Sequence, residues 1–325
     1  MSSKNALLFI HAQTSLHPGT GTALGTVDMP IQRERHTAWP MIAGSSLKGV
    51  VRDKTRPPDK KSDEWNQWLS VFGAENGDPE SHAGALALTD ARILAFPVRS
   101  AKGVFAWVTC PAVLARLMRD ATLAGIADLP FKGDEFLSLE NSSIESVAFA
   151  AQDTPLAIDE NNEKRLLLEE FDFTLNTNSG SMESVKPIAE WIGKHATADE
   201  FSQKRIANYL VVISDTEFTH FAKNATEVAA RIGLDYETKT VTGGALFYEE
   251  FLPTETLMYA VVLANSSRWL DSDSGNGAVS KAMTATEVLN FLTSRLNKEP
   301  ILQIGANETI GKGLCSVRFE SNTVT

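Results

Sequence analysis

One long segment that fits neither a helix nor a strand constrains this chain more than any other feature. Residues 13–37 read QTSLHPGTGTALGTVDMPIQRERHT, with no helical period and too many glycines for a strand. The segment follows an apolar run at 6–12, ALLFIHA, which predicts a buried strand. Because irregular connections of this length are uncommon inside compact domains, we expect the segment to be a functional or mobile loop.

The overall composition is that of a soluble globular protein. Of the 325 residues, 43% are hydrophobic and 22% are charged, which excludes fibrous, collagen-like and wholly disordered classes. No apolar stretch approaches the length of a membrane span, and the N-terminus lacks the pattern of a signal peptide. The two cysteines, Cys110 and Cys315, lie too far apart for a metal knuckle or a disulfide framework. We expect a cytoplasmic protein with no membrane partner.

The charge is distributed unevenly along the chain. The formal net charge is −11, yet residues 1–56 hold seven basic residues against three acidic ones. The distribution of charge matters more than its sum for contact with nucleic acid, so a restricted basic face stays compatible with an acidic chain.

The remaining elements follow from local patterns. A helix is expected to start at Gly44-Ser45-Ser46, where a serine can cap the free N–H groups, and to end before Pro57-Pro58. Residues 59–83 are polar and are expected to be irregular. The other predicted elements are one or two strands at 85–98, helices at 111–120, 224–233 and 284–296, strands at 208–215 and within 244–263, a loop at 271–278, and a Gly-rich loop at 303–313 that leads into a final strand.

This order of elements is α+β rather than a strict alternation of strands and helices. A ferredoxin-like sheet with large insertions fits it. The pattern weakens and becomes acidic at about 121–205, which predicts an inserted or peripheral subdomain. The sequence contains no internal repeat of 20–50 residues.

The predicted helix after residue 44 carries a basic face. Lys48 and Arg52 are i, i+4 neighbours and Arg56 follows one turn later. A helix N-terminus with hydroxyls beside it, together with a glycine at position 49, suits a phosphodiester backbone. The simpler interpretation, an amphipathic helix with a solvated basic face, remains open at this point.

The loop at 303–313 ends in Gly-Lys but does not match a phosphate-binding P-loop. Its spacing is one residue too long, Gly313 stands where a hydroxyl residue should bind magnesium, and a strand follows instead of a helix. Asn307 and Lys312 remain able to meet a ligand. A plain connection between strands explains the loop equally well.

Loop 13–37 holds the carboxylate of Asp28 together with His17, Arg33, Arg35 and His36. Such a carboxylate can hold Mg²⁺ or act as a general base, although a lone loop aspartate more often forms a local turn. The segment Tyr248-Glu249-Glu250 adds carboxylates near it or forms the polar face of a strand end. No Ser-His-Asp, Cys-His, HExxH or CxxC pattern is present.

Three stretches carry a family resemblance: LHPGTGTALGTVDMPIQRERHTAWPMIAGSSLKGVVRD (16–53), GALFYEEFLPTETLMY (244–259) and IGANETIGKGLC (304–315). The chain resembles the RAMP superfamily, and within it the backbone (fourth) subunits of type III-B CRISPR (Cmr) effector complexes. The resemblance implies a single domain over 1–325 with a ferredoxin-like (RRM-like) palm and inserted finger and thumb elements. It also implies that copies stack head to tail along a guide RNA, beside other Cmr subunits, and expose the paired target RNA.

The same resemblance implies roles for individual residues. Asp28 is the expected catalytic residue and the expected ligand of Mg²⁺ or a similar divalent metal. His17, Tyr248 and Glu249 are secondary catalytic candidates. The expected RNA-binding residues are Gln32, Arg33, Arg35, Ser45, Ser46, Lys48, Arg52, Asn307 and Lys312.

These residues are chemically sufficient for RNA cleavage. RNA carries its own nucleophile, the 2′-OH, so a protein needs only to impose in-line geometry and to assist proton transfer and charge. We therefore expect a metal-dependent endoribonuclease that cuts target RNA at regular intervals inside its complex. The alternatives are a non-catalytic RNA-binding scaffold protomer and a free-standing enzyme of an unrelated class.

Overall fold

A computed structural model describes residues 3–22, 25–74, 82–127, 129–131, 146–175, 179–267 and 282–321 of the chain. The helices are α1 (Gly44–Lys54), α2 (Asp63–Phe72), α3 (Pro111–Leu123), α4 (Ser179–Ala196), α5 (Glu200–Tyr209), α6 (Asp215–Asn224), α7 (Ala285–Lys298) and the short 3-10 helix η2 (Glu308–Ile310). The strands are β1 (Lys4–Ala12), β2 (Met41–Ile42), β3 (Leu86–Leu88), β4 (Ala91–Arg99), β5 (Phe105–Thr109), β6 (Val147–Ala150), β7 (Ile158–Glu160), β8 (Glu163–Leu168), β9 (Phe171–Leu175), β10 (Leu210–Val212), β11 (Glu227–Leu234), β12 (Val241–Phe251), β13 (Leu257–Ala264), β14 (Ile301–Gln303) and β15 (Leu314–Glu320). The fold is therefore mixed α+β, as the element order predicts.

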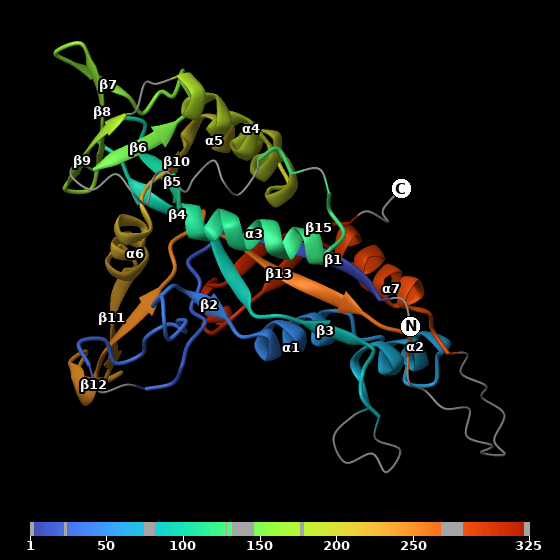
Figure 1. The fold of residues 1–325 in the computed structure, drawn as a ribbon. Coiled ribbons are helices and arrows are strands. Elements are labelled where there is room, and N and C mark those ends of the chain that lie inside the picture. Colours follow the sequence, from blue (N-terminus) through green and yellow to red (C-terminus); the bar gives the residue numbers. More distant parts are fainter. Residues whose placement is uncertain are drawn as a thin grey trace.

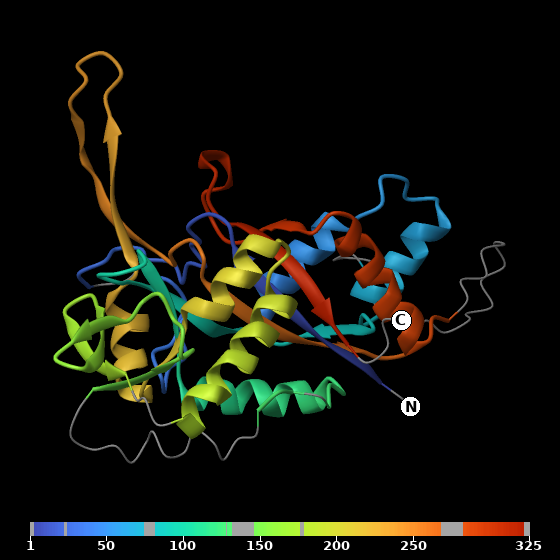
Figure 2. The same cartoon turned by 90° about the horizontal axis from the view of Figure 1, so that it is seen from above.

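Most strands join one sheet that runs the length of the molecule. Within the described residues it has 13 strands, in the order β14-β15-β1-β13-β4-β5-β10-β6-β9-β8-β7, with β2 and β3 added at its side. The first strand, β1, pairs antiparallel with both β13 and β15. Its residues Ala6–Ala12 are all buried, because helices cover both faces of the sheet here. Figures 1 and 2 show α3 on one side of β13 and α1 with α2 on the other.

Several predicted elements are confirmed. The apolar run at 6–12 lies in β1, and 85–98 forms β3 and most of β4. The helix expected after Cys110 is α3, which begins with Pro111 in its first turn. The capping box predicted at Thr284 and Glu287 is present at the start of α7. Both cysteines are buried, free thiols.

Strands β11 and β12 form a separate hairpin that projects far from the body of the molecule (Figure 2). The helix predicted at 224–233 is wrong, because this segment is β11. The motif Asn224-x-x-Glu227 resembles a helix cap, but Val228, Ala230, Ile232 and Leu234 alternate with period two, which suits a strand. The helix in this part of the chain is α6, which ends at Asn224, where the predicted helix was expected to begin. Ser214 and Glu217 form a complete capping box at its start.

Two further expectations need correction. Residues 59–83 are not irregular throughout, because α2 forms there with Ser62 as its N-cap and Trp65 and Trp68 on its buried face. The start of α1 is not capped by a serine: Ala43 is the N-cap, and the carboxylate of Asp90 accepts the N–H of Gly44 at 2.7 Å instead. A partner distant in the sequence therefore does the work expected of the local hydroxyls.

The segment at 121–205 contains more regular structure than its weak pattern predicts. It holds strands β6 to β9, helix α4 and most of α5, and its strands continue the main sheet through the contact of β6 with β10. Its division into a separate subdomain stays a prediction. The loop predicted at 271–278 lies outside the described residues. Among the helices that are described, none combines the length and apolar character needed to cross a bilayer.

Candidate nucleic-acid interface and catalytic loop

Loop 13–37 is held against the base of the β11–β12 hairpin. Leu16 pairs with Leu252 in an antiparallel bridge, and Met29 pairs with Glu249 in a parallel one. The N–H of Met29 donates to the carbonyl of Tyr248 at 3.0 Å, and the N–H of Glu250 donates back to Met29 at 3.0 Å. The loop backbone is thus hydrogen-bonded to the edge of β12. These bonds fix the conformation of a segment that has no regular secondary structure.

Asp28 lies where this pairing begins. Its Oδ2 accepts the backbone N–H of Tyr248 at 2.7 Å, and its side chain is half-buried. The other oxygen, Oδ1, has no hydrogen-bond partner among the residues that the structure describes. One oxygen therefore orients the carboxylate and the second remains available to a ligand.

A buried polar cluster lies next to this loop. The Nδ1 of His17 contacts the carbonyl of Glu250 at 2.6 Å, and its Nε2 lies 3.7 Å from Oε1 of Glu249. Asn307 donates to the same oxygen of Glu249, and Nε of Arg231 donates to the other at 3.2 Å. His17 is 2% exposed and Glu249 is 3% exposed, so these two predicted residues support the site from beneath. Tyr248, at 43%, is open to solvent.

Two glycines allow the chain segments to approach this closely. A Cβ on Gly19 would lie 2.5 Å from Nε2 of His17, and one on Gly305 would lie 2.3 Å from the carbonyl of His17. Gly305 also has a φ of +80°, which a residue with a side chain rarely adopts. The Gly-rich loop at 303–313 is therefore packed on loop 13–37. It brings Lys312 to 5.0 Å from the ring of Phe251 as well.

Glu250 was named with Glu249 as a carboxylate near Asp28, but it was given no role of its own. Its carboxylate accepts the N–H of Ile31 at 3.0 Å, a guanidinium N–H of Arg33 at 2.5 Å and the hydroxyl of Thr226 at 2.8 Å. The sequence contained one signal for a separate role of Glu250. Adjacent strand residues point to opposite faces, so the tandem Glu249-Glu250 places the two carboxylates on different sides of the strand. Arg231 and Thr226 gave no such signal, since both lie in the segment predicted as a helix.

The RNA-binding residues predicted in loop 13–37 divide into two kinds. Gln32 is occupied within the protein, because it donates to Gly19 at 2.9 Å and accepts the N–H of Ala43, the N-cap of α1, at 2.9 Å. Arg33 is occupied by Glu250 and by the carbonyls of Ala38 and Ala222. Arg35 is exposed. Of these three predicted contacts, Arg35 is the one placed to meet a ligand directly.

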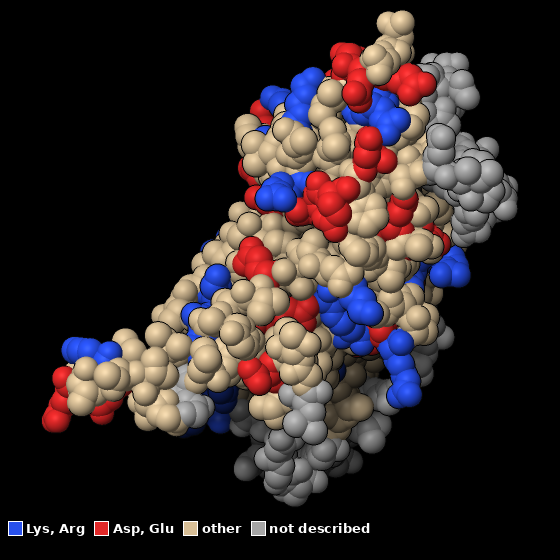
Figure 3. Space-filling view, turned by 90° about the vertical axis from the view of Figure 1, so that its left-hand side faces the viewer, with Lys and Arg blue, Asp and Glu red and all other residues tan. Residues whose placement is uncertain are grey.

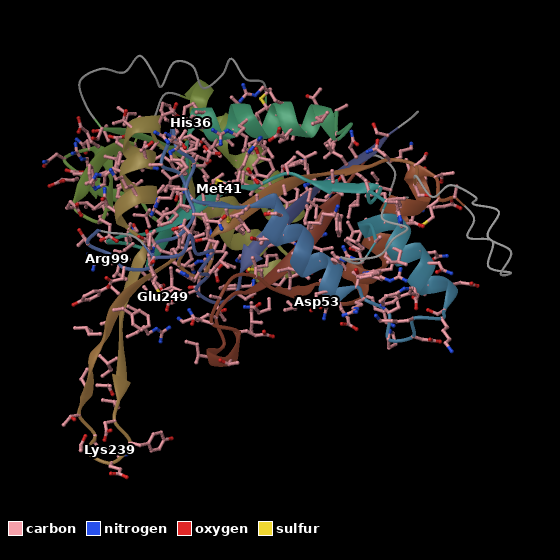
Figure 4. The ribbon with its side chains drawn as sticks, turned by 90° about the horizontal axis from the view of Figure 1, so that it is seen from below. His36, Met41, Asp53, Arg99, Lys239 and Glu249 are labelled. Atoms are coloured by element: carbon pink, nitrogen blue, oxygen red, sulfur yellow. The ribbon has the colours of Figure 1, made fainter. Side chains whose placement is uncertain are left out.

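Helix α1 lies apart from the Asp28 cluster, and its residues Gly49, Val50, Asp53 and Lys54 line a groove. Ser45, Ser46 and Gly49 are exposed on one side of α1. A Cβ on Gly49 would meet no atom within 4 Å. The groove has a volume of about 520 Å³ and is lined by Gly49, Val50, Asp53, Lys54, Ile301, Gln303, Glu308 and Leu314. In Figure 4, Asp53 on α1 lies well away from Glu249 at the base of the hairpin.

The two cations predicted on α1 are partly used by the fold. Lys48 donates to the carbonyl of Leu86 at 2.8 Å. Burial, and then the nearby charge of Arg52, lower the pKa of Lys48. The guanidinium of Arg52 lies 4.6 Å from the centre of the Trp68 ring. Both side chains are half-buried, so a cation–π contact and a backbone contact fix where their charge is presented.

Charge is mixed on the face that carries the projecting hairpin. Figure 3 shows acidic and basic side chains interspersed there, with both signs at the tip of the projection. The tip includes Asp235, Glu237 and Lys239. The basic excess of residues 1–56 therefore does not become one continuous positive field on this face.

The carboxylates and histidines of the site do not form a complete metal-binding set. Within the described part of the chain, no group of three His, Cys, Asp or Glu side chains lies close enough to hold one ion. Asp28 offers one free oxygen. This donor set fits Mg²⁺ only in the mode in which most ligands are water and substrate phosphate oxygens.

Comparison with known proteins agrees with this arrangement. The family model of the RAMP superfamily matches residues 9–316. The CRISPR system Cmr endoribonuclease Cmr4 of Pyrococcus furiosus is 36% identical over 98% of this chain and 97% of its own length. A crystal structure of oligomeric Cmr4 from Pyrococcus furiosus superposes with a TM-score of 0.67 at 31% identity, covering 98% of this chain and 99% of that one.

A more distant likeness extends the comparison of folds. A chain of the type III-B Cmr-beta complex bound to cognate target RNA superposes with a TM-score of 0.66 at 21% identity, covering 97% of this chain and 96% of its own. The family match spans loop 13–37, the β11–β12 hairpin and the Gly-rich loop alike. From the loop, the fold and these matches together, the chain belongs to the RAMP superfamily, among relatives named Cmr4.

Proposed function

We propose that this chain is the guide-RNA-binding backbone subunit of a type III-B CRISPR (Cmr) complex and that it cleaves complementary target RNA at regular intervals. The complex would act in the cytoplasm, with other Cmr subunits. The observation that carries the proposal is Asp28, held by the N–H of Tyr248 at 2.7 Å with its second oxygen free among the described residues. The name of the Pyrococcus furiosus relative, a Cmr endoribonuclease, supports RNA cleavage as the activity.

The body of the molecule is proposed to be a ferredoxin-like palm. The strand order β15-β1-β13-β4, with α1 between β1 and β4 and α7 between β13 and β15, supports this assignment. It is the βαββαβ order of that fold, with both crossover helices in their expected places. On this assignment the β11–β12 hairpin is the thumb.

Asp28 is proposed to act on the RNA itself. The 2′-OH of a target nucleotide attacks the adjacent phosphorus, its proton passes to the carboxylate, and the 5′-oxygen of the next nucleotide leaves. Cleavage requires the 2′-oxygen, the phosphorus and the leaving oxygen to lie in line, which A-form geometry prevents. The projecting hairpin beside Asp28 is suited to displace a nucleotide from the duplex and so to allow that alignment.

We further propose that a divalent cation assists this reaction. Asp28 would hold the ion through one of its bound waters, and phosphate oxygens of the RNA with further water would supply its ligands, as Mg²⁺ commonly accepts. The free oxygen of Asp28 would then stay able to take the proton of the 2′-OH. When bound, such an ion would neutralise charge that develops on the phosphate. The buried pair of His17 and Glu249 would keep the Gly-rich loop and the catalytic loop in register beneath it.

The guide strand is proposed to lie along the α1 groove. The bare backbone at Gly49, which lines the groove, and the exposed hydroxyls of Ser45 and Ser46, in the preceding turn of α1, suit a phosphodiester. The oligomeric state named for the Pyrococcus furiosus structure supports stacking of copies along that guide. Asp53 and Glu308 also line the groove. Their carboxylates would favour ribose hydroxyls over phosphates as neighbours.

The test is an Asp28→Asn variant in the reconstituted complex with guide RNA and partner subunits. Because Asn keeps the shape and removes the charge, we expect cleavage to fall by about two orders of magnitude or more. Target affinity is expected to stay within about twofold, since one loop carboxylate adds nothing to phosphate binding. End-labelled target RNA, incubated with and without Mg²⁺, gives both the rate and the spacing of the cuts.

The outcomes separate the candidate functions. A regular ladder in the wild type that disappears in the variant supports the nuclease. Cleavage that survives Asp28→Asn would contradict the assignment of the catalytic residue. Target that is bound but intact in the wild type would make the chain a non-catalytic scaffold.

A further inference from the structure

We propose that Glu250 is the positioning residue of this site: it holds the loop that carries Asp28 on the hairpin, and cleavage depends on it although it touches no RNA. The inference rests on the proposed function, because it needs Asp28 to be the residue that acts on the target. It concerns a side chain that is 6% exposed and lies on the face of β12 opposite Glu249.

The side chain of Glu250 joins three segments. Its Oε2 accepts the N–H of Ile31 at 3.0 Å, three residues after Asp28. Its Oε1 accepts a guanidinium N–H of Arg33 at 2.5 Å and the hydroxyl of Thr226 at 2.8 Å. Ile31 and Arg33 belong to the catalytic loop, whereas Thr226 directly precedes β11. One carboxylate therefore ties the loop to both strands of the hairpin.

The backbone of Glu250 serves the same loop a second time. Its N–H donates to the carbonyl of Met29 at 3.0 Å, and its carbonyl accepts from Nδ1 of His17 at 2.6 Å. Asp28 itself is held by Tyr248, two residues before Glu250. One short stretch of β12 thus sets the position of the proposed catalytic carboxylate. Glu250 supplies most of the contacts between this stretch and loop 13–37.

Arg33 extends this anchor in both directions. Its guanidinium donates to Ala38, directly after the loop, at 2.8 Å and to Ala222 in the last turn of α6 at 2.9 Å. The helix C-terminus favours a cation, and the Glu250 carboxylate neutralises it. Because Arg33 is committed to these contacts, its value to the activity comes through the loop and not through RNA.

A carboxylate is needed at position 250, because it must accept from three donors. A glutamine has one oxygen and an NH₂ group, so at least one of its contacts would face donor to donor. Inside a buried cluster such a mismatch is costly and is relieved by movement of the least restrained segment. That segment is the loop, and a displacement of about 1 Å at a reacting group can cost on the order of 100-fold in rate.

The experiment compares Glu250→Gln, Arg33→Lys, Asp28→Asn and Glu255→Gln in the reconstituted complex. Glu255 is the matched control, since it also lies in the β12–β13 region and contacts a histidine, His11, at 2.8 Å, but makes no direct hydrogen bond or ion pair from its side chain to the described residues of loop 13–37. The measurements are the single-turnover cleavage rate with complex in excess, the target Kd by filter binding, and the melting temperature of each chain.

For Glu250→Gln we expect a rate loss of about 10- to 100-fold with the target Kd unchanged within twofold. Glu255→Gln should cleave at the wild-type rate even if its melting temperature falls as far. Arg33→Lys keeps the charge but not the forked contacts and should slow cleavage in the same way. It also supplies the test if Glu250→Gln fails to assemble.

Each failure is recognisable. Cleavage by Glu250→Gln and Arg33→Lys within threefold of wild type, while Asp28→Asn is inactive, would overturn the positioning role and leave the proposed function intact. A loss of target binding equal to the loss of cleavage would overturn it as well. Full cleavage by Asp28→Asn would instead defeat the proposed function on which the inference rests.

Discussion

The two adjacent glutamates of β12 serve opposite sides of the hairpin. Glu249 pairs across the strands with Ala229 and reaches His17, Asn307 and Arg231, whereas Glu250 reaches loop 13–37. A shift of one residue in the strand register would turn each carboxylate to the opposite face, away from its present donors. The register of the hairpin is therefore part of the chemistry of the site.

Lys48 gives a prediction about pH. Since burial, followed by the charge of Arg52, lowers its pKa from the ordinary 10.5, the folded protein releases this proton before the unfolded chain does. Between the lowered pKa and 10.5 the unfolded state binds more protons, so Lys48 adds stability as the pH rises through that window. Carbon-13 NMR of the reductively methylated protein, assigned with Lys48→Arg, should give a midpoint below 10.5.

The causes can be separated by one further variant. Arg52→Gln should raise the Lys48 midpoint only slightly, because burial is the larger cause. A midpoint at or above 10.5 in the wild type would show that Lys48 is more solvated than its contact with Leu86 implies.

Gly49 gives a prediction that opposes stability to binding. In the interior of α1 a glycine costs about 0.5–1 kcal/mol relative to alanine, and the added Cβ would meet open space. Gly49→Ala is therefore expected to raise the free energy of unfolding by about that amount. It is also expected to lower the affinity for guide RNA, because the RNA backbone would meet the new methyl group. Denaturant unfolding and guide affinity check the two halves.

The matched control for Gly49→Ala is Thr122→Ala, an exposed position of α3 away from the groove. It should also favour helix but leave guide affinity unchanged. If Gly49→Ala and the wild type bind guide RNA with equal affinity, the proposal that the guide lies in this groove is wrong.

The sequence identifies the proposed catalytic residue better than it identifies its supports. Asp28 stands in a stretch that carries the family resemblance, and the resemblance predicts its role, whereas local reasoning alone favours a turn residue there. Arg33 looks like an RNA contact until its partner, Glu250, is known, and that partner lies more than two hundred residues away. Single-sequence patterns carry no information about such pairs, and for this reason the division between structural and exposed cations was not predictable.

Among the elements, the hairpin shows how a tertiary context overrides a local signal. Residues 224–233 carry an N-cap motif, but β12 offers a complete partner edge from Phe251 to Leu246. The hairpin also carries most of the exposed large apolar side chains of the described residues. On its two strands, Val228, Ile232, Leu234, Leu246 and Tyr248 are between 43% and 54% exposed. A projecting hairpin with one apolar face is built for contacts outside its own chain.

Polar substitution on that face is therefore expected to spare the fold. Ile232 and Leu246 are cross-strand partners, 54% and 53% exposed. Changing both to serine should leave the melting temperature within a few degrees, because the removed atoms are not in the core. The same change should reduce assembly into the complex or cleavage by it, as measured by light scattering and the target assay.

Leu123→Ser is the control, because Leu123 is also 53% exposed but lies at the end of α3. It should leave assembly and cleavage as in the wild type. If the double hairpin variant assembles and cleaves normally, the apolar face has no role in the complex.

At the scale of the whole molecule, the sequence predicts the class of fold and its family but not the extent of the sheet. The α+β order, β1, α1, α3, α7 and the final strand were all expected. The strands β6 to β9 were not, since short strands in an acidic segment take their stability from β10 and the core beside them. A pattern that is weak in isolation becomes regular when an existing sheet edge is available.

The net charge is also a property of the whole chain. A formal net charge of −11 makes the surface acidic on average. On the proposed function, contact with RNA is therefore confined to particular grooves and loops. The groove beside α1 contains both signs, Lys54 and Asp53 among them. Affinity there would come from shape and hydrogen bonding as much as from positive charge.

The packing of the Gly-rich loop on loop 13–37 also determines when the site can exist. His17 is synthesised about 290 residues before the backbone that covers it, at Gly305 and Ala306. A nascent chain that has not reached Gly305 therefore carries Asp28 without the completed support beside it. On the proposed function, the site is assembled only after the Gly-rich loop has folded back onto loop 13–37.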